Sequence, residues 1–146
     1  MRVSLQHVSH DYAGTEDSAA VHVLEDVSLE IGDGDFAVLM GASGSGKSTL
    51  LNLIGAVDRP TSGKVFLDDA DTSQLRESGL TKLRRESIGF IFQFFNLIPT
   101  LDVKENVAFP LSLARAEGIA ERVEAALDEV GLAHRARHFP NELSGG

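Results

Sequence analysis

A run of nine residues near position 45 has the composition of a phosphate-binding loop. It matches the pattern G-x-x-x-x-G-K-[ST] in full and consists of Gly41, Ala42, Ser43, Gly44, Ser45, Gly46, Lys47, Ser48 and Thr49. Its glycines allow backbone N–H groups to approach phosphate oxygens closely. Lys47 can place its charge near the β- and γ-phosphates, and the Ser48 hydroxyl can ligate Mg²⁺. The loop therefore predicts binding of a nucleoside triphosphate, with Mg²⁺-ATP as the expected ligand.

The segments on either side of this loop match the strand and helix that a phosphate loop needs. Residues 36–40 form a continuous apolar run, which predicts a strand buried on both faces of a parallel sheet. Residues 48–55 predict a short helix whose N-terminus faces the phosphates. A glycine-rich turn with a chance lysine would not need this context. A dinucleotide-binding fold is disfavoured because its glycine pattern lacks the Lys-Ser pair and expects an acidic residue about 20 positions on.

The remaining elements predict an α/β chain with a β-rich opening and a helical end. Alternating residues 3–8 and 27–31 predict half-buried strands, and residues 65–67 and 88–92 predict two more. Residues 13–20 predict a loop, and 32–35 and 60–63 predict turns. Residues 80–85 predict a helix with Leu80 and Leu83 on one face. Farther on, a stripe at helical spacing predicts core packing, formed by Ile119, Val123, Leu127 and Val130.

Composition narrows the class of protein. The 146 residues fit one domain, and a hydrophobic content of 42% is enough for a globular core. The net charge of −9 argues against a general nucleic-acid binder, which needs a basic surface. With no cysteine, the chain forms neither disulfides nor thiolate metal sites. The N-terminus lacks the apolar region of a secretory signal, and the longest apolar stretch, 88–99, is shorter than the ~20 residues of a membrane span.

Four further features resemble the ATP-binding-cassette (ABC) ATPases. Residues 143–146, Leu-Ser-Gly-Gly, resemble their signature motif, and Gln93 after an apolar segment resembles their Q-loop. Tyr12 lies where these ATPases carry an aromatic residue that stacks on adenine. Residues 96–107 resemble the opening of their helical subdomain. Together with residues 80–85 and 90–97, these motifs are most similar to the ATPases of lipoprotein release and macrolide export.

The resemblance implies a fold, a division of the chain and a set of roles. The fold would be a phosphate-loop NTPase core with an N-terminal antiparallel β subdomain, over residues of about 1–95, and a helical subdomain, over about 96–146. Tyr12 would stack on adenine, and residues 43–49 would surround the phosphates. Ser48 and Gln93 would reach Mg²⁺, and Gln93 would also sense the lytic water. Ser144, Gly145 and Gly146 would contact ATP held by the other subunit of a head-to-tail homodimer.

Each of these residues also has a simpler interpretation. Tyr12 could be an ordinary surface aromatic, and Gln93 a polar residue at the end of a strand. Leu-Ser-Gly-Gly alone is typical of a helix cap or turn. Residues 65–69, Val-Phe-Leu-Asp-Asp, have the apolar-then-acidic pattern of a Walker B motif. Their apolar run is only three residues long, so an ordinary strand and turn is the preferred interpretation.

The function implied by the resemblance is coupling of ATP binding and hydrolysis to export by a membrane permease. The chain would then lie in the cytoplasm, at the inner face of the membrane. By resemblance, the Walker B strand, the catalytic Glu and the switch His lie beyond Gly146, so we expect this chain to be marginally folded and to hydrolyse ATP poorly or not at all. Three alternatives are a non-transport ABC ATPase, a nucleotide-binding module without turnover, and a phosphate-loop kinase. A kinase would leave Gln93 and residues 143–146 unexplained.

Overall fold

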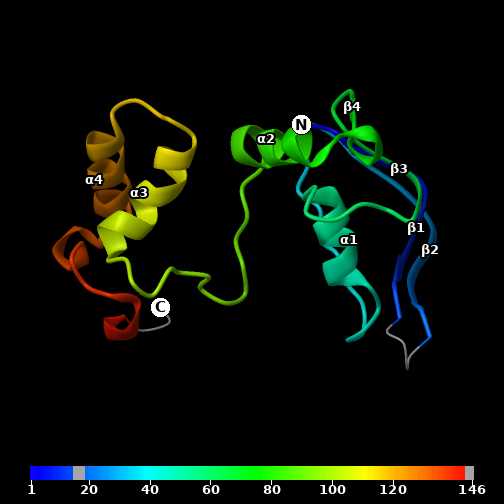
Figure 1. Ribbon diagram of the computed structural model, residues 1–146, viewed down its shortest axis with the longest axis horizontal. Coiled ribbons are helices and arrows are strands. Elements are labelled where there is room, and N and C mark those ends of the chain that lie inside the picture. The colour runs from blue at the N-terminus through cyan, green and yellow to red at the C-terminus, as the bar shows by residue number, and fades with distance from the viewer. Residues whose placement is uncertain (15–18, 144–146) are drawn as a thin grey trace. The chain divides into compact units, whose positions relative to one another are not determined.

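The computed structural model describes residues 1–14 and 19–143. The chain divides into two compact units, Met1–Gly89 and Phe90–Gly146. The first unit contains an antiparallel sheet in the order β2-β1-β3-β4, seen in Figure 1 as the blue and green strands. The strands are β1 (Val3–Tyr12), β2 (Val21–Ile31), β3 (Ser62–Leu67) and β4 (Ala70–Asp71). The strands predicted at 3–8, 27–31 and 65–67 are therefore confirmed. All three extend farther than predicted, and β3 begins at Ser62, within the turn predicted at 60–63.

Strand β1 holds the sheet together because it pairs on both edges. Val3 lies opposite Ile31 of β2 and Leu67 of β3, while Leu5 lies opposite Leu29 and Val65 on the same two strands. Val3 and Leu5 are both buried. This apolar pairing provides the face on which the helices of the unit pack.

Two helices complete the core of the first unit. Helix α1 (Lys47–Ile54) follows the phosphate loop, and α2 (Glu77–Ser87) follows a short 3₁₀ turn, η1 (Thr72–Gln74). Leu53 of α1 is fully buried, and Leu80 of α2 is almost so, in the same apolar cluster as the sheet residues. Both predicted helices are thus confirmed, and Leu83 packs against the same cluster as predicted. The cluster consists of Val3, Leu5, Val8, Leu24, Leu50, Leu53, Ala56, Val65, Leu67 and Leu80.

The second unit is helical. Helices α3 (Val103–Leu113) and α4 (Ile119–Glu129) lie side by side in Figure 1 and are followed by the 3₁₀ turns η2 (Ala133–Arg135) and η3 (Pro140–Glu142). Asp102 and Glu105 form a capping box that satisfies backbone N–H groups at the start of α3. Val123 and Leu127 are buried as predicted, whereas Val130 is 65% exposed. The core prediction for Val130 is wrong because α4 ends at Glu129 and the helical spacing stops there.

Two predicted strands do not form. Residues 36–40 and 88–92 lie outside any helix or strand, and Phe36, Met40 and Ile91 are strongly exposed. A strand requires neighbours that satisfy its backbone hydrogen bonds, and neither segment pairs with the β2-β1-β3-β4 sheet. An apolar run thus indicates the capacity for burial, but it does not supply the partner strand. No helix within residues 1–14 and 19–143 is long and apolar enough to cross a bilayer.

Candidate nucleotide-binding site

The phosphate loop joins helix α1 at Gly46, and the structure explains why glycine is needed there. Gly46 caps the helix with a φ of 83°, in the left-handed region that residues with a side chain rarely adopt. A Cβ atom at this position would lie 2.9 Å from Cδ2 of Leu24 and 3.0 Å from the carbonyl oxygen of Val23. The loop therefore passes directly against β2, with no room for a side chain between them.

Lys47 lies folded across the loop. Its Nζ atom donates hydrogen bonds to the carbonyl oxygens of Gly41, at 2.9 Å, and Ala42, at 2.6 Å, and lies 3.4 Å from Oγ of Ser45. The ammonium group is thereby held over the backbone that the sequence pattern assigns to phosphate binding. Because Lys47 is a compact charge on a flexible stem, it can exchange these neutral acceptors for an anion.

The start of α1 adds a second source of positive potential. The N–H groups of Lys47, Ser48 and Thr49 belong to the first helical turn, where no intrahelical acceptor exists. No acidic residue lies in that turn to offset the helix dipole. The buried residues Leu50 and Leu53 anchor the helix in the core, which fixes the direction of its N-terminus. The residues here fit a bound phosphate group.

A cavity of about 540 Å³ opens at this point of the first unit. All but one of its lining residues belong to the loop or the first turn of α1, and the exception, Val23, comes from β2. The lining consists of Val23, Ser43, Gly44, Gly46, Lys47, Ser48 and Thr49. The structure therefore gathers most of the predicted phosphate-binding residues around one open space.

Tyr12 lies next to the phosphate loop although 37 positions separate it from Thr49. Its hydroxyl group is 3.3 Å from Oγ1 of Thr49, within hydrogen-bonding distance. The side chain is partly exposed, and its ring contacts the ring of His10 edge to face. The antiparallel sheet brings the end of β1 to α1, so Tyr12 and the loop belong to the same region of the fold. The sequence alone did not single out His10. Its position on the buried side of β1, two residues before Tyr12, is the feature that indicates a contact with Tyr12.

The other predicted ligands, Gln93 and residues 144–146, belong to the second unit. Gln93 belongs to the second unit, in the segment between α2 and α3, and its side chain is exposed. Ser144, Gly145 and Gly146 lie outside the described residues.

Asp68, of the Walker-B-like stretch, is an exposed turn residue between β3 and β4, and its carboxylate accepts a hydrogen bond from the backbone N–H of Arg2. The strand-and-turn interpretation of residues 65–69 is therefore confirmed.

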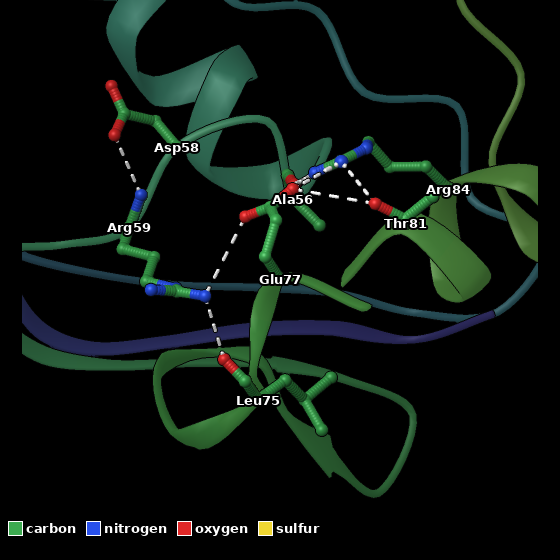
Figure 2. A network of polar contacts seen from close by, with 7 residues as sticks. All are labelled: Ala56, Asp58, Arg59, Leu75, Glu77, Thr81 and Arg84. Carbon is green, nitrogen blue, oxygen red and sulfur yellow. Dashed lines mark hydrogen bonds and ion pairs between the residues drawn. The ribbon is translucent and has the colours of Figure 1, made fainter. Parts of the chain in front are cut away.

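A polar network ties the far end of α1 to α2 (Figure 2). Figure 2 shows Glu77 between the guanidinium groups of Arg59 and Arg84. Arg84 donates to Oε1 of Glu77 at 2.7 Å and also to the buried carbonyl of Ala56, just after α1. The hydrogen bond that Glu77 accepts from Arg84, with the charges of Arg84 and Arg59, lowers the pKa of Glu77 below its ordinary value. The network holds the C-terminal end of the helix whose N-terminus forms the site.

In the second unit, Asn106 organises the turn that precedes α3. Its Oδ1 atom accepts the N–H of Ile98 at 2.8 Å. Its Nδ2 atom lies 2.9 Å from the carbonyl oxygens of both Leu101 and Asp102, and 3.1 Å from that of Ile98. One side chain thus satisfies several backbone groups of residues 98–102. This role explains why the segment that resembles the opening of the helical subdomain contains an asparagine within its helix.

Comparison with known proteins decides the family. A family profile described as ABC transporter matches residues 24–146. The chain belongs to the ABC transporter family. It carries part of that family's ATP-binding domain, and the similarity extends over nearly all of the described residues.

Individual relatives agree with this assignment. The uncharacterized ABC transporter ATP-binding protein YknY of Bacillus subtilis is 49% identical over 127 residues, which cover 85% of this chain and 55% of YknY. The lipoprotein-releasing system ATP-binding protein LolD of Acinetobacter baylyi is 43% identical over 135 residues, covering 90% of this chain and 59% of LolD. This chain therefore spans a little more than half the length of these two relatives.

A solved structure confirms the predicted fold class. The ATP-binding cassette MJ0796 of Methanocaldococcus jannaschii, solved as a dimer in a post-hydrolysis state with ADP and Pi, matches with a TM-score of 0.86. The match is 43% identical and covers 98% of this chain and 63% of the MJ0796 chain. The antiparallel sheet, the loop, α1 and the helical unit are thus parts of an ABC ATPase fold.

Proposed function

We propose that this chain binds Mg²⁺-ATP as the ATP-binding part of an ABC-type export complex. The observation that carries the proposal is the placement of Lys47 over the loop at the N-terminus of α1. Backbone N–H groups, the helix dipole and one mobile cation are the groups that hold a triphosphate. Ser48 would supply the hydroxyl ligand to Mg²⁺, and Gln93 would reach the metal and sense the lytic water.

The proposal extends to the partners. MJ0796 is described as dimeric, and LolD as part of a lipoprotein-releasing system. We infer a head-to-tail homodimer, in which Ser144, Gly145 and Gly146 contact ATP held by the other subunit, and a membrane permease that contacts the residues after Gln93. Phe94 and Phe95, directly after Gln93, are 73% and 70% exposed and would give an apolar contact surface.

The net charge of −9 disfavours a nucleic-acid partner. A permease that co-purifies with the protein would support the export function, whereas co-purified nucleic acid would favour a non-transport ABC ATPase.

The central test is equilibrium binding of ATP in the presence of Mg²⁺. We expect saturable binding by the protein and loss of binding in Lys47→Ala, because the substitution removes the charge that faces the phosphates. Lys82→Ala, on the exposed surface of α2, is the matched control and should bind like the parent. Equal affinity in the parent and in Lys47→Ala would contradict the proposal.

Turnover is a separate part of the proposal. The residues that line the loop cavity include no carboxylate to orient a water molecule. We expect these 146 residues to bind ATP and to hydrolyse it far more slowly than the ~1 s⁻¹ typical of enzymes. A phosphate-release assay measures this rate. Hydrolysis at an enzyme-like rate that disappears in Lys47→Ala would show that the turnover part is wrong.

A further inference from the structure

His10 is a buried side chain for which the proposed ATP site gives no role. Only 5% of its surface is exposed, and it lies opposite Leu24 of β2 in the sheet. Neither of its ring nitrogens has a hydrogen-bond partner among the described residues. Buried polar groups are nearly always paired, so an unpaired buried imidazole needs an explanation. Thr72 shows the usual pattern, because its buried hydroxyl donates to the carbonyl of Val65.

The two other histidines of the sheet have ordinary surroundings. The side chains of His7 and His22 are 81% and 80% exposed. Each places Nδ1 at 2.7 Å from a carboxylate, that of Asp26 for His7 and that of Asp11 for His22. His10 differs from both, because its nearest carboxylate oxygen, Oδ2 of Asp58, lies 3.5 Å from Nε2 without forming a hydrogen bond. Surface pairing therefore does not account for its position.

The ring of His10 also contacts the ring of Tyr12. The two ring centroids are 4.7 Å apart, and the planes meet at 84°, an edge-to-face arrangement. This geometry is one that aromatic rings favour, because the positive edge of one meets the negative face of the other. Tyr12 is thus held at two points, by His10 against its ring and by Thr49 at its hydroxyl group.

We propose that His10 is a positioning residue that holds the ring of Tyr12 in the orientation needed to stack on the base of the nucleotide. The inference rests on the proposed ATP-binding function. A partly exposed aromatic side chain would otherwise sample several rotamers and lose that freedom on binding. Oδ2 of Asp58 lies 3.5 Å from Nε2 of the same imidazole. His10 itself touches no part of the ligand; it acts through Tyr12.

The test compares a ligand that has a base with one that has none. The base preference is the dissociation constant for inorganic tripolyphosphate divided by that for ATP, each measured with Mg²⁺ by calorimetry on the 146-residue protein. Tyr12→Ala should lower this ratio about 5-fold or more, because stacking on an aromatic ring is lost. His10→Leu should lower it about 2- to 10-fold, the range of an aromatic pair contact. His10→Leu should leave tripolyphosphate binding unchanged.

Two further variants separate positioning from general packing. His10→Phe keeps an aromatic edge against Tyr12 and should restore the base preference. His22→Leu removes a histidine that pairs with Asp11, close to Tyr12 in the sheet, and should leave the ratio unchanged. If His10→Leu does not fold, His10→Gln replaces it, because glutamine has no ring but keeps a polar group toward Asp58. Each variant is first checked for a cooperative thermal transition.

A second measurement reports on the contact itself. Tyr12 is the single tyrosine of the chain, and the chain has no tryptophan, so all of its tyrosine fluorescence comes from Tyr12. His10→Leu should change this emission, whereas His22→Leu should not. An emission unaffected by His10→Leu would overturn the inferred contact.

The outcomes distinguish the inference from the function on which it rests. Binding of neither ligand would overturn the proposed function and the inference with it. A ratio that falls in Tyr12→Ala but not in His10→Leu would overturn the positioning role alone. Equal weakening of ATP and tripolyphosphate in His10→Leu would assign His10 a purely structural role and would likewise overturn the inference. A lowered ratio that His10→Phe restores would support it.

Discussion

The hydroxyl group of Tyr12 lies 3.3 Å from Oγ1 of Thr49, and this contact connects the end of β1 to the first turn of α1. Thr49 is buried, whereas Tyr12 is partly exposed, so the contact joins the core to the surface of the site. The helix that presents its N-terminus to the phosphates is thereby attached to the strand that carries the candidate base-stacking residue.

Tyr12→Phe removes this contact and keeps the aromatic ring. We expect a loss of about 0.5–1.5 kcal/mol in the free energy of unfolding, the net value of an ordinary hydrogen bond. ATP affinity should change little, because the ring and its contact with His10 remain. Urea denaturation and calorimetry on the same preparations measure the two effects. A large loss of ATP affinity in Tyr12→Phe would mean that the hydroxyl group, rather than the ring, matters for binding.

Leu53 and Leu51 are neighbours on α1 with opposite environments. Leu53 is fully buried, and Leu51 is 55% exposed. We expect Leu53→Ala to lower the free energy of unfolding by about 2–5 kcal/mol, because it leaves a cavity under the helix. Leu51→Ala should stay within about 0.5 kcal/mol of the parent. Urea titrations measure both, and equal losses in the two variants would contradict the burial of Leu53 beneath α1.

Gly63 and Gly34 both have positive φ angles, of 82° and 79°, but they differ in the space around them. A Cβ atom at Gly63 would lie 2.2 Å from the carbonyl oxygen of His7, whereas one at Gly34 would meet nothing within 4 Å. Gly34→Ala should therefore cost only the backbone strain, about 1–2 kcal/mol. Gly63→Ala should cost more, because β1 and β3 must also move apart. Thermal denaturation of the two variants side by side tests the difference.

Glu77 gives a pH dependence whose direction follows from its surroundings. The hydrogen bond from Arg84, followed by the charges of Arg84 and Arg59, lowers the pKa of Glu77 in the folded protein below the ordinary value of 4.5. Its contribution to stability is therefore present above that value and is lost as the pH falls through the lowered pKa. The effect is small because the side chain is 70% exposed.

The expected result is a small difference in Tm between Glu77→Gln and the parent at pH 7 that shrinks as the pH falls below the ordinary pKa of 4.5. Ser78→Ala, at an exposed position of the same helix that carries no carboxylate, is the control and should show a Tm difference that does not shrink in this way. Thermal scans at several pH values measure this difference. A Tm difference for Glu77→Gln that grows as the pH falls would contradict a lowered pKa for Glu77 in the folded protein.

Local sequence patterns were sufficient to predict two kinds of element. These are the elements whose hydrogen-bonding partners lie close in the sequence and those that carry a specific motif. The loop at 41–49 carries a nine-residue motif, and the alternation of apolar and polar residues at 3–8 and 27–31 predicted the strands β1 and β2. The apolar runs at 36–40 and 88–92 were predicted as strands, and this was wrong for the described structure. A strand depends on a hydrogen-bonding neighbour, which no property of the run itself can supply.

The sequence by itself determined the phosphate loop, because glycines, a lysine and a hydroxyl at fixed spacing act through backbone geometry within one short segment. It also placed the loop at the start of a helix. Tertiary structure alone decided that Tyr12 reaches Thr49 and that Gly46 passes against Leu24. Both contacts join positions that are distant in the sequence, and they depend on how β1, β2 and α1 pack around one core. The contact between His10 and Tyr12 is different, because residues two apart on one strand share a face.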